Sequence, residues 1–354
     1  MAGVIRLSNE RAWRTYLGGS KIDELHGVAS QGDNHFPEEW IMSITACRNA
    51  GREHITDEGM SKDVSSGKHL AELIAESPEE LLGKQHYESI GSTTGVLIKI
   101  IDSSERLSIQ VHPNKEMAKK LFHSDYGKTE SWHILGGREV DGEVPCIYLG
   151  FKKGITKEQW KDVFDRQDIP KMLDCLHKIE VQEGETYLIK GGVPHAIGAG
   201  CFLLEVQEPT DYTIRTERTT VSGFQIADSM CHQGIGFEKM FECFTYEGME
   251  REELLAKYKL SAKNDGEVET LINYNDTTCF GLKKLYINET YTIHAENTFY
   301  GIYVLRGNGT LSFDGTTEHI EVGNQFFVSA ATSVVLKADE PLVVAQFFGP
   351  QCKN

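Results

Sequence analysis

Short apolar runs separated by glycine-containing turns recur along most of the chain. β-Branched and aromatic residues are frequent in these runs, which favours strands over helices. The predicted strands are residues 95–101, 107–112, 129–135, 185–189, 201–207, 280–287, 298–306, 310–313, 325–328 and 342–348. Many short strands of this kind predict a mainly β fold, built as sandwiches or barrels.

Apolar residues at helical spacing mark three segments between the strands. In residues 70–82, Ser77-Pro78 provides a cap and a first residue that restart a helix. Asn114 is suited to cap a short helix, and a further helical stretch over 156–177 is interrupted at Pro170. We therefore expect helical insertions at about 66–90, 114–126 and 155–178.

A weak internal repeat relates the two parts of the chain. Residues 181–195 and 320–334 both contain a glycine turn, an aromatic strand, a small-residue turn and the start of a second strand. The repeat predicts two β-barrel domains in tandem. We place their boundary near the charged, helix-like stretch 247–259, which gives domains of residues 1–245 and 246–354. His195 in the first corresponds to Val334 in the second. Because His294 and His319 are the only histidines in residues 280–348, we expect the second barrel to be metal-free.

Charge and length restrict the possible partners. The chain has 354 residues and a formal net charge of −17, which argues against nucleic acid, whose binding depends on clustered Lys and Arg. It contains no apolar run of about 18 residues, so no membrane partner is expected. The first residues lack the apolar region of a signal peptide, which predicts a cytoplasmic protein.

The eight cysteines are scattered, and none forms a C-x-x-C pair. Dispersed thiols in a reducing compartment are usually small core residues. Zinc held by cysteine is therefore not expected.

Three polar segments could carry chemistry, and the first is Leu107-Ser108-Ile109-Gln110-Val111-His112-Pro113. Residues two apart on a strand point to the same side, so Ser108, Gln110 and His112 share one face. An ordinary solvated sheet face would show the same pattern, and this alternative stays open.

The second segment is Gly127-Lys128-Thr129-Glu130-Ser131-Trp132-His133. As a strand it places Lys128, Glu130 and Trp132 on one face and His133 on the other, so His133 cannot bind a metal beside Glu130. A surface ion pair between Lys128 and Glu130 is the simpler alternative.

The third segment contains Pro194-His195, placed after a glycine turn, and a strand that carries Leu203, Glu205 and Gln207 on one face. A single histidine or glutamate in such a position is most often structural. Considered together, however, Gln110, His112, Glu130 and His195 offer two nitrogens and two oxygens, a mixture that suits zinc. Only one of the four is anionic, so a bound ion would keep positive charge and act as a Lewis acid.

These ordered motifs resemble those of the type I phosphomannose isomerases of the cupin superfamily, in a short form. The resemblance rests on LSIQVHP, GKTE and PHAIGAG, with Trp13, Gly18-Gly19 and residues 36–41 in support. It covers residues 10–220 well and the remainder loosely. The short insertion at 152–177 and the sequence after Arg215 differ from the longer forms, and this affects the phosphate contacts more than the metal site.

The resemblance implies a zinc-dependent aldose–ketose isomerase that interconverts mannose 6-phosphate and fructose 6-phosphate through an enediol. It implies two tandem cupin barrels and one Zn²⁺ per chain, as a monomer or a homodimer. The implied zinc ligands are Gln110, His112, Glu130 and His195. The implied substrate and catalytic residues are Ser108 and Lys128 as substrate contacts, Glu205 as base and Arg215 as active-site arginine.

Two other functions fit parts of the pattern. An iron-dependent cupin dioxygenase could use His112, His195 and Glu130 as two histidines and one carboxylate. A non-catalytic sugar-binding cupin could keep the same scaffold. Gln110 and Lys128 count against the first, and Glu205 counts against the second, because a binding protein needs no base.

Overall fold

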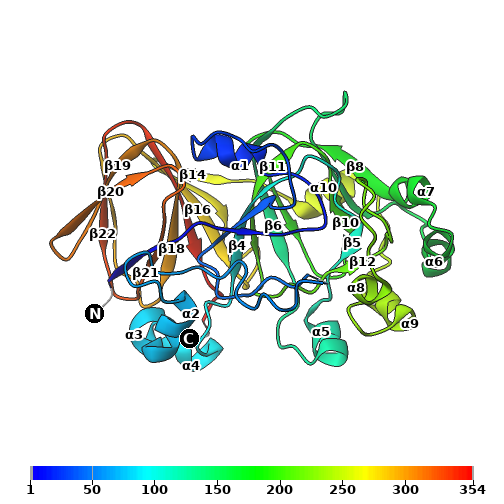
Figure 1. Cartoon of the computed structure of the whole chain (residues 1–354), viewed down its shortest axis with the longest axis horizontal. Helices are drawn as coiled ribbons and strands as arrows, with labels where there is room; N and C mark the ends of the chain where they lie inside the picture. Colours follow the sequence, from blue (N-terminus) through cyan, green and yellow to red (C-terminus); the bar gives the residue numbers. More distant parts are fainter. Residues whose placement is uncertain (1–2, 50, 353–354) are drawn as a thin grey trace.

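The computed structural model describes residues 3–49 and 51–352. It is mainly β: strands form four sheets, and short helices lie around them (Figure 1). The neighbouring strands of these sheets pair antiparallel throughout the described residues. The predicted mainly β class is confirmed.

Two sheets come mostly from the first part of the chain. Sheet 1 contains, in spatial order, β13 (Lys259–Leu260), β9 (Thr186–Ile189), β6 (Glu130–Gly137), β11 (Cys201–Gln207), β4 (Leu97–Asp102), β3 (Glu38–Ile41) and β2 (Glu10–Ala12). Sheet 2 contains β12 (Ile214–Arg215), β5 (Gln110–Val111), β10 (His195–Ile197), β7 (Cys146–Phe151) and β8 (Leu176–Glu180).

The other two sheets come mostly from the second part. Sheet 3 contains β1 (Val4–Leu7), β21 (Gln325–Val328), β18 (Tyr300–Arg306), β23 (Leu342–Phe348), β16 (Gly281–Ile287), β15 (Val268–Ile272) and β14 (Lys263–Asp265). Sheet 4 contains β17 (Thr290–Ile293), β22 (Val334–Ala338), β19 (Asn308–Phe313) and β20 (Thr316–Glu321).

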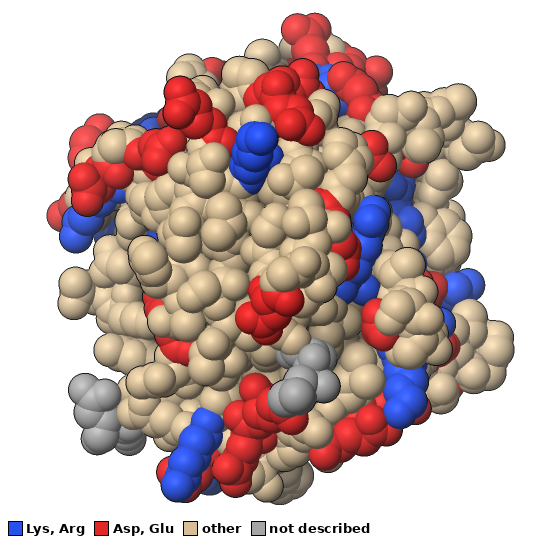
Figure 2. Space-filling model, turned by 90° about the vertical axis from the view of Figure 1, so that its left-hand side faces the viewer, with Lys and Arg blue, Asp and Glu red and all other residues tan. Residues whose placement is uncertain are grey.

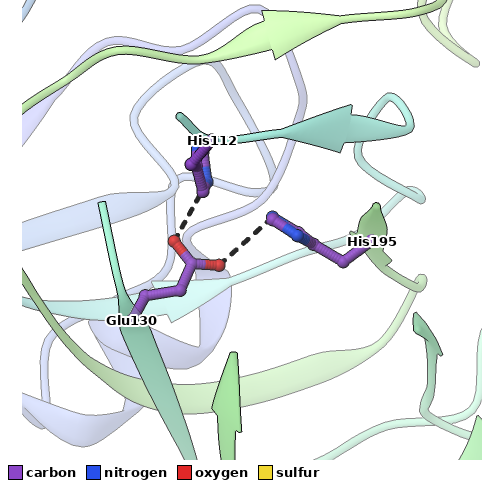
Figure 3. A group of neighbouring side chains, drawn as sticks. All are labelled: His112, Glu130 and His195. Atoms are coloured by element: carbon purple, nitrogen blue, oxygen red, sulfur yellow. Dashed lines mark ion pairs between the residues drawn. The ribbon is translucent and has the colours of Figure 1, made fainter. Parts of the chain in front are cut away.

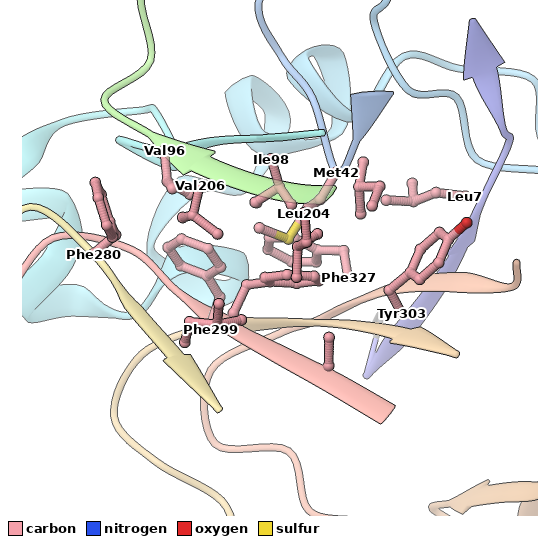
Figure 4. Packing of buried hydrophobic residues seen from close by; sticks show 14 of the residues in the cluster. Leu7, Met42, Val96, Ile98, Leu204, Val206, Phe280, Phe299, Tyr303 and Phe327 are labelled. Carbon is pink, nitrogen blue, oxygen red and sulfur yellow. The ribbon is translucent and has the colours of Figure 1, made fainter. Parts of the chain in front are cut away.

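The sheets pack in the order 2–1–3–4, so sheet 1 is covered on both faces. On β11, Leu203 packs in a core shared with sheet 2, whereas Leu204 and Val206 pack in a core shared with sheet 3. Figure 4 shows this second core, in which Val206 and Phe327 come from the two parts of the chain. Cover on both faces explains why β3, β4, β9 and β11 are buried at every residue rather than at alternate ones.

Sheet 4 closes the opposite end of the stack. On β22, Val334 and Leu336 are buried against sheet 3, and Val335 and Lys337 point outward. Figure 2 looks onto this end, where acidic side chains lie mainly around the edge of the face. One buried and one solvated face is the usual arrangement of an antiparallel sheet at the surface.

Helices occur in all three predicted insertions, and further ones lie outside these at 20–25, 228–243 and 251–258. They are α1 (Ser20–Leu25), α2 (Leu70–Glu76), α3 (Pro78–Leu82), α4 (Lys84–Ile90), α5 (Lys115–Phe122), α6 (Lys157–Asp165), α7 (Ile169–Asp174), α8 (Asp228–His232), α9 (Phe237–Met240), the 3-10 turn η1 (Phe241–Cys243) and α10 (Arg251–Tyr258). Pro78 begins α3, and the Asn114 side chain accepts a hydrogen bond from the Met117 amide and caps α5. The insertion predicted to end at 178 ends earlier, because residues from Leu176 onward pair with β7.

The internal repeat is present in the fold. β9 begins at Thr186 and β10 at His195, with the same spacing as Gln325 and Val334 at the starts of β21 and β22. Two short strands pair with strands from the other part of the chain. β1, from the first part, pairs with β21 in sheet 3, and β13, from the second part, pairs with β9 in sheet 1. All eight cysteines are free, and seven are buried, as expected of small core residues.

Candidate metal centre and active site

The candidate metal ligands meet between sheets 1 and 2. Gln110 on β5 lies directly opposite His195 on β10, and Glu130 begins β6 on the facing sheet. His112 follows β5 by one residue. The Glu130 carboxylate lies between the two imidazole rings (Figure 3). Three segments far apart in the sequence therefore meet at one point.

The candidate ligands His112, Glu130 and His195 lie close together and are almost completely buried. His112 Nε2 lies 3.0 Å from Glu130 Oε2, and His195 Nε2 lies 3.2 Å from Glu130 Oε1. The side-chain amide nitrogen of Gln110 lies 3.3 Å from His195 Nε2, and a half-turn of the amide would present its oxygen there. Within the described residues, His112, Glu130 and His195 are the one group of three such side chains close enough to hold a metal ion.

The hydrogen bonds of the two histidines fix their tautomers. His112 Nδ1 lies 2.8 Å from the Tyr212 carbonyl, and His195 Nδ1 lies 2.8 Å from the Val193 carbonyl. A carbonyl only accepts, so both Nδ1 atoms carry the proton and both Nε2 lone pairs face the Glu130 carboxylate. Lone pairs directed at an anion repel it unless a cation lies between them. This donor set therefore fits a metal ion.

The ionisation of the three ligands agrees with metal binding. Burial lowers the pKa of His112 to about 3 and also lowers the pKa of His195, so both rings are neutral at pH 7. Burial alone would raise the pKa of Glu130, but the two histidines and the Lys128 ammonium hold this pKa well below its usual range. Neutral imidazoles and a carboxylate are the forms that bind divalent metals.

Lys128 lies at the edge of this group. Its ammonium is 3.1 Å from His112 Nε2 and 3.5 Å from Glu130 Oε2, and the side chain is buried. Burial lowers the pKa of Lys128. The simple surface ion pair is thus excluded for this lysine, because both partners are in the interior.

Glu205 lies on the same face of sheet 1, one strand away from Glu130. Its Oε1 is 3.1 Å from Lys99 Nζ, and its Oε2 accepts a hydrogen bond of 3.2 Å from Trp132 Nε1. Burial raises the pKa of Glu205, and the Lys99 ammonium opposes this increase. A buried carboxylate with a raised pKa is a candidate general base.

A pocket beside the metal group brings these residues together, and we call it the inner pocket. It has about 40 Å³ of free space, which is room for roughly three water molecules. Its walls include all the predicted substrate and catalytic residues and one predicted ligand, namely Ser108, Gln110, Lys128, Glu205 and Arg215. The Ser108 hydroxyl is buried without a hydrogen-bond partner among the described residues, so it is available to a ligand.

Arg215 pairs in register with Gln110 on the neighbouring strand. Its guanidinium donates hydrogen bonds to the Thr213 and Met230 carbonyls, at 3.1 and 3.4 Å. His133, by contrast, lies on the opposite face of β6, where its Nδ1 is 2.9 Å from the Thr186 hydroxyl. The strand register excludes His133 from the metal group, as predicted.

Sequence reasoning missed a buried ionic network in the wall of the inner pocket. Arg14 donates to Glu38 Oε2 at 2.8 Å and to both oxygens of Asp211 at 3.0 and 3.1 Å. Lys99 lies 3.6 Å from Glu38, which joins this network to Glu205. One signal was present, because Lys99 is the single charge inside the apolar run Gly95–Ile101.

The predicted strand over 107–112 is shorter than expected. Only Gln110–Val111 forms ladder pairs, because the Ile109 amide donates to the Glu217 carboxylate instead of to a strand. Ser108 and Gln110 nevertheless lie on the same side of this segment, because both line the inner pocket.

A mainly β fold with a buried His–Glu–His group beside a polar pocket defines a candidate metalloprotein. Residues 31–130 match the family model of the phosphomannose isomerase type I catalytic domain. The protein named probable mannose-6-phosphate isomerase GmuF, from Bacillus subtilis (strain 168), is 27% identical over 91% of this chain and 90% of its own length. Mannose-6-phosphate isomerase of Streptococcus mutans serotype c is 34% identical over 43% of this chain and 44% of its own length.

Solved structures share the fold. A crystal structure of mannose 6-phosphate isomerase from Bacillus subtilis has a TM-score of 0.74 and 21% identity, and the match covers 98% of this chain and 99% of that one. A mannose 6-phosphate isomerase bound with zinc and yttrium has a TM-score of 0.71 and 15% identity, over 99% and 100% of the two chains. The match to the family model and the similar sequences confirm the resemblance to the type I phosphomannose isomerases, and the solved structures show that the fold is shared. In the described residues, no helix is long and apolar enough to cross a membrane.

Proposed function

We propose that this protein is a zinc-dependent mannose-6-phosphate isomerase of the cytoplasm. The observation that carries the proposal is a buried His112–Glu130–His195 group directly beside a polar pocket that is lined by Glu205. We further propose that sheets 1 and 2 form one cupin barrel and sheets 3 and 4 a second, with the main division of the chain near residues 245–246, while β1 belongs to the second barrel and β13 to the first.

Zinc would be held by His112, Glu130 and His195, with the amide oxygen of Gln110 as the fourth ligand. Two histidines, one carboxylate and one neutral oxygen donor are compatible with zinc's mixed preferences. A zinc ion bound there supplies a Lewis acid that polarises sugar oxygens. The Nδ1 hydrogen bonds of the two histidines would hold their rings in the ligating orientation.

The chain's own residues would move the protons. Glu205 would take the proton from C2 of the open-chain aldose and return it to C1, while O1 gains and O2 loses a proton. These proton transfers convert an aldehyde into a ketone through an enediol without any change in the number of atoms. The raised pKa of Glu205 brings its proton affinity closer to neutral pH, which favours reversible transfer.

Lys128, Ser108 and Arg215 would orient the substrate. Lys128 and Arg215 provide positive charge that offsets the overall net charge of −17 near an anionic substrate. The unpartnered hydroxyl of Ser108 would bond to a sugar hydroxyl. Arg215, whose planar fork suits charged oxygens, would contact the enediolate or the phosphate.

A turnover assay with mannose 6-phosphate, with and without chelator, tests this proposal. We expect isomerisation that is lost on chelation and restored by zinc. His112→Ala and His195→Ala should lose zinc and activity together, because the remaining ligands bind the ion weakly. Full zinc content and normal turnover in either variant would contradict the metal assignment. Oxygen uptake by the iron-loaded protein would instead favour a dioxygenase.

A further inference from the structure

The loop between β3 and α2 holds an arginine, Arg48, at a fixed position beside the inner pocket. The Arg48 amide donates to the Asp211 carboxylate at 3.1 Å, and Asp211 lines that pocket. On one side, the Cys47 amide donates to the Glu58 carbonyl; on the other, the Asn49 side chain donates to the Trp13 carbonyl. The backbone at Arg48 is thus anchored to buried groups, although its side chain is exposed.

The Arg48 side chain is free to bind an anion. Its guanidinium lies over the ring of Tyr212, 5.5 Å from the ring centroid, and makes no ion pair with any described residue. Nearby arginines differ: Arg14 is paired with Glu38 and Asp211, and Arg52 is paired with Glu58 at 2.7 Å. An arginine held over an aromatic ring and lacking a carboxylate partner keeps its donors available.

Arg48 lines a second, larger cavity, which we call the outer pocket. It has about 450 Å³ of free space, against about 40 Å³ in the inner pocket. The two pockets adjoin at Arg215 and Met230: Arg215 lines the inner pocket and donates to the Met230 carbonyl, and Met230 lines the outer pocket. A ligand that fills the inner pocket and continues past Arg215 would reach the outer pocket.

We propose that Arg48 binds the phosphate group of the sugar phosphate at the junction of the inner and outer pockets. This inference rests on the proposed function, because that function supplies a substrate with a reactive end and an anionic end. The reactive end would lie between the metal group and Glu205, and the anionic end would reach Arg48. In a chain of net charge −17, such a fixed cation also raises the local concentration of an anionic substrate.

The role assigned to Arg48 is binding and specificity, not chemistry. Losing a charged hydrogen-bonding partner of phosphate typically costs about 10- to 100-fold in affinity. We expect Arg48→Gln to raise KM for mannose 6-phosphate by about this factor and to change kcat by less than about threefold. Arg48→Lys should recover part of the loss, since lysine keeps the charge without the planar fork.

Calorimetric titration with inorganic phosphate tests the site without turnover. Wild-type protein should bind phosphate, and Arg48→Gln should bind it at least about 10-fold more weakly. Arg166→Gln, which removes an exposed arginine paired with Asp162 on α6, is the charge-matched control and should bind as the wild type does. Zinc content and melting temperature should stay at the wild-type values in Arg48→Gln, Arg48→Lys and Arg166→Gln.

The outcomes separate this inference from the proposed function. Equal phosphate affinity in wild type and Arg48→Gln would overturn the inference, as would no phosphate binding by the wild type, even if the wild type isomerises mannose 6-phosphate. Phosphate binding through Arg48 without isomerisation would instead refute the proposed function and leave the anion site in place.

Discussion

Glu38 is expected to make the stability of the protein depend on acid pH. Its carboxylate is buried and accepts hydrogen bonds from Arg14, Trp40 and Tyr16 at 2.7 to 2.8 Å. Burial alone would raise the pKa of Glu38, but Arg14, Lys99 and these hydrogen bonds lower it from 4.5 to about 2. The native state therefore binds this proton much less readily than the unfolded chain does.

The pKa difference gives both the sign and the size of the effect. Because the pKa is lower in the folded state, the stabilisation is complete above the unfolded value and is lost as pH falls through the folded value. A shift from 4.5 to about 2 corresponds to a contribution of about 3 kcal/mol. Of this, about 2 kcal/mol is expected to be lost between pH 7 and pH 3.

Urea unfolding at several pH values between 7 and 3 measures this contribution. Glu38→Gln should be less stable than wild type at pH 7, because Arg14 and Lys99 lose a buried anion. Its stability should also fall with acid by about 2 kcal/mol less than that of wild type. Glu252→Gln, at an exposed glutamate of α10, is the control and should follow the wild-type curve. Equal pH dependence in wild type and Glu38→Gln would refute the reasoning.

Two further predictions concern the roles of individual residues. Glu205→Gln keeps size but removes basicity, so zinc should remain bound while turnover and proton exchange at C2 fall at least about 100-fold; near-normal exchange would mean that another residue is the base. His294→Ala and His319→Ala, at two exposed positions of the second part of the chain, should leave kinetics unchanged, with one zinc per chain. Elemental analysis that finds two tightly bound metals, the second lost on these mutations, would disprove the metal-free second barrel.

The site residues that sequence could predict are those in short strand motifs with a visible alternation. Gln110 and His112 are two residues apart, and Lys128 and Glu130 repeat the same spacing. Such spacing determines which side chains share a face, and the structure brings these faces together. The glycine turn at 191–192 likewise predicts that His195 stands at the start of a short strand, as it does in β10.

The network around Arg14 could not be predicted in this way. Its members belong to β3, β4 and two loops, and they meet only because strand register places Trp40 opposite Lys99 and Lys99 opposite Glu205. No local pattern encodes a register between residues that are 59 and 106 positions apart in the chain. The same limit applies to Arg48, whose significance depends on a cavity formed by distant loops.

The pairing of β1 with β21 has a consequence for the order in which the protein is made. Val4–Leu7 is synthesised more than 300 residues before its partner Gln325–Val328. The face of sheet 1 that carries Ile98 and Val206 likewise stays exposed until the residues that cover it, which include Tyr303 and Phe327, have been synthesised. During this interval the nascent chain exposes apolar strands that are prone to associate. The packing of the first part is therefore completed only after these distant strands have been synthesised, and its exposed apolar strands need protection until then.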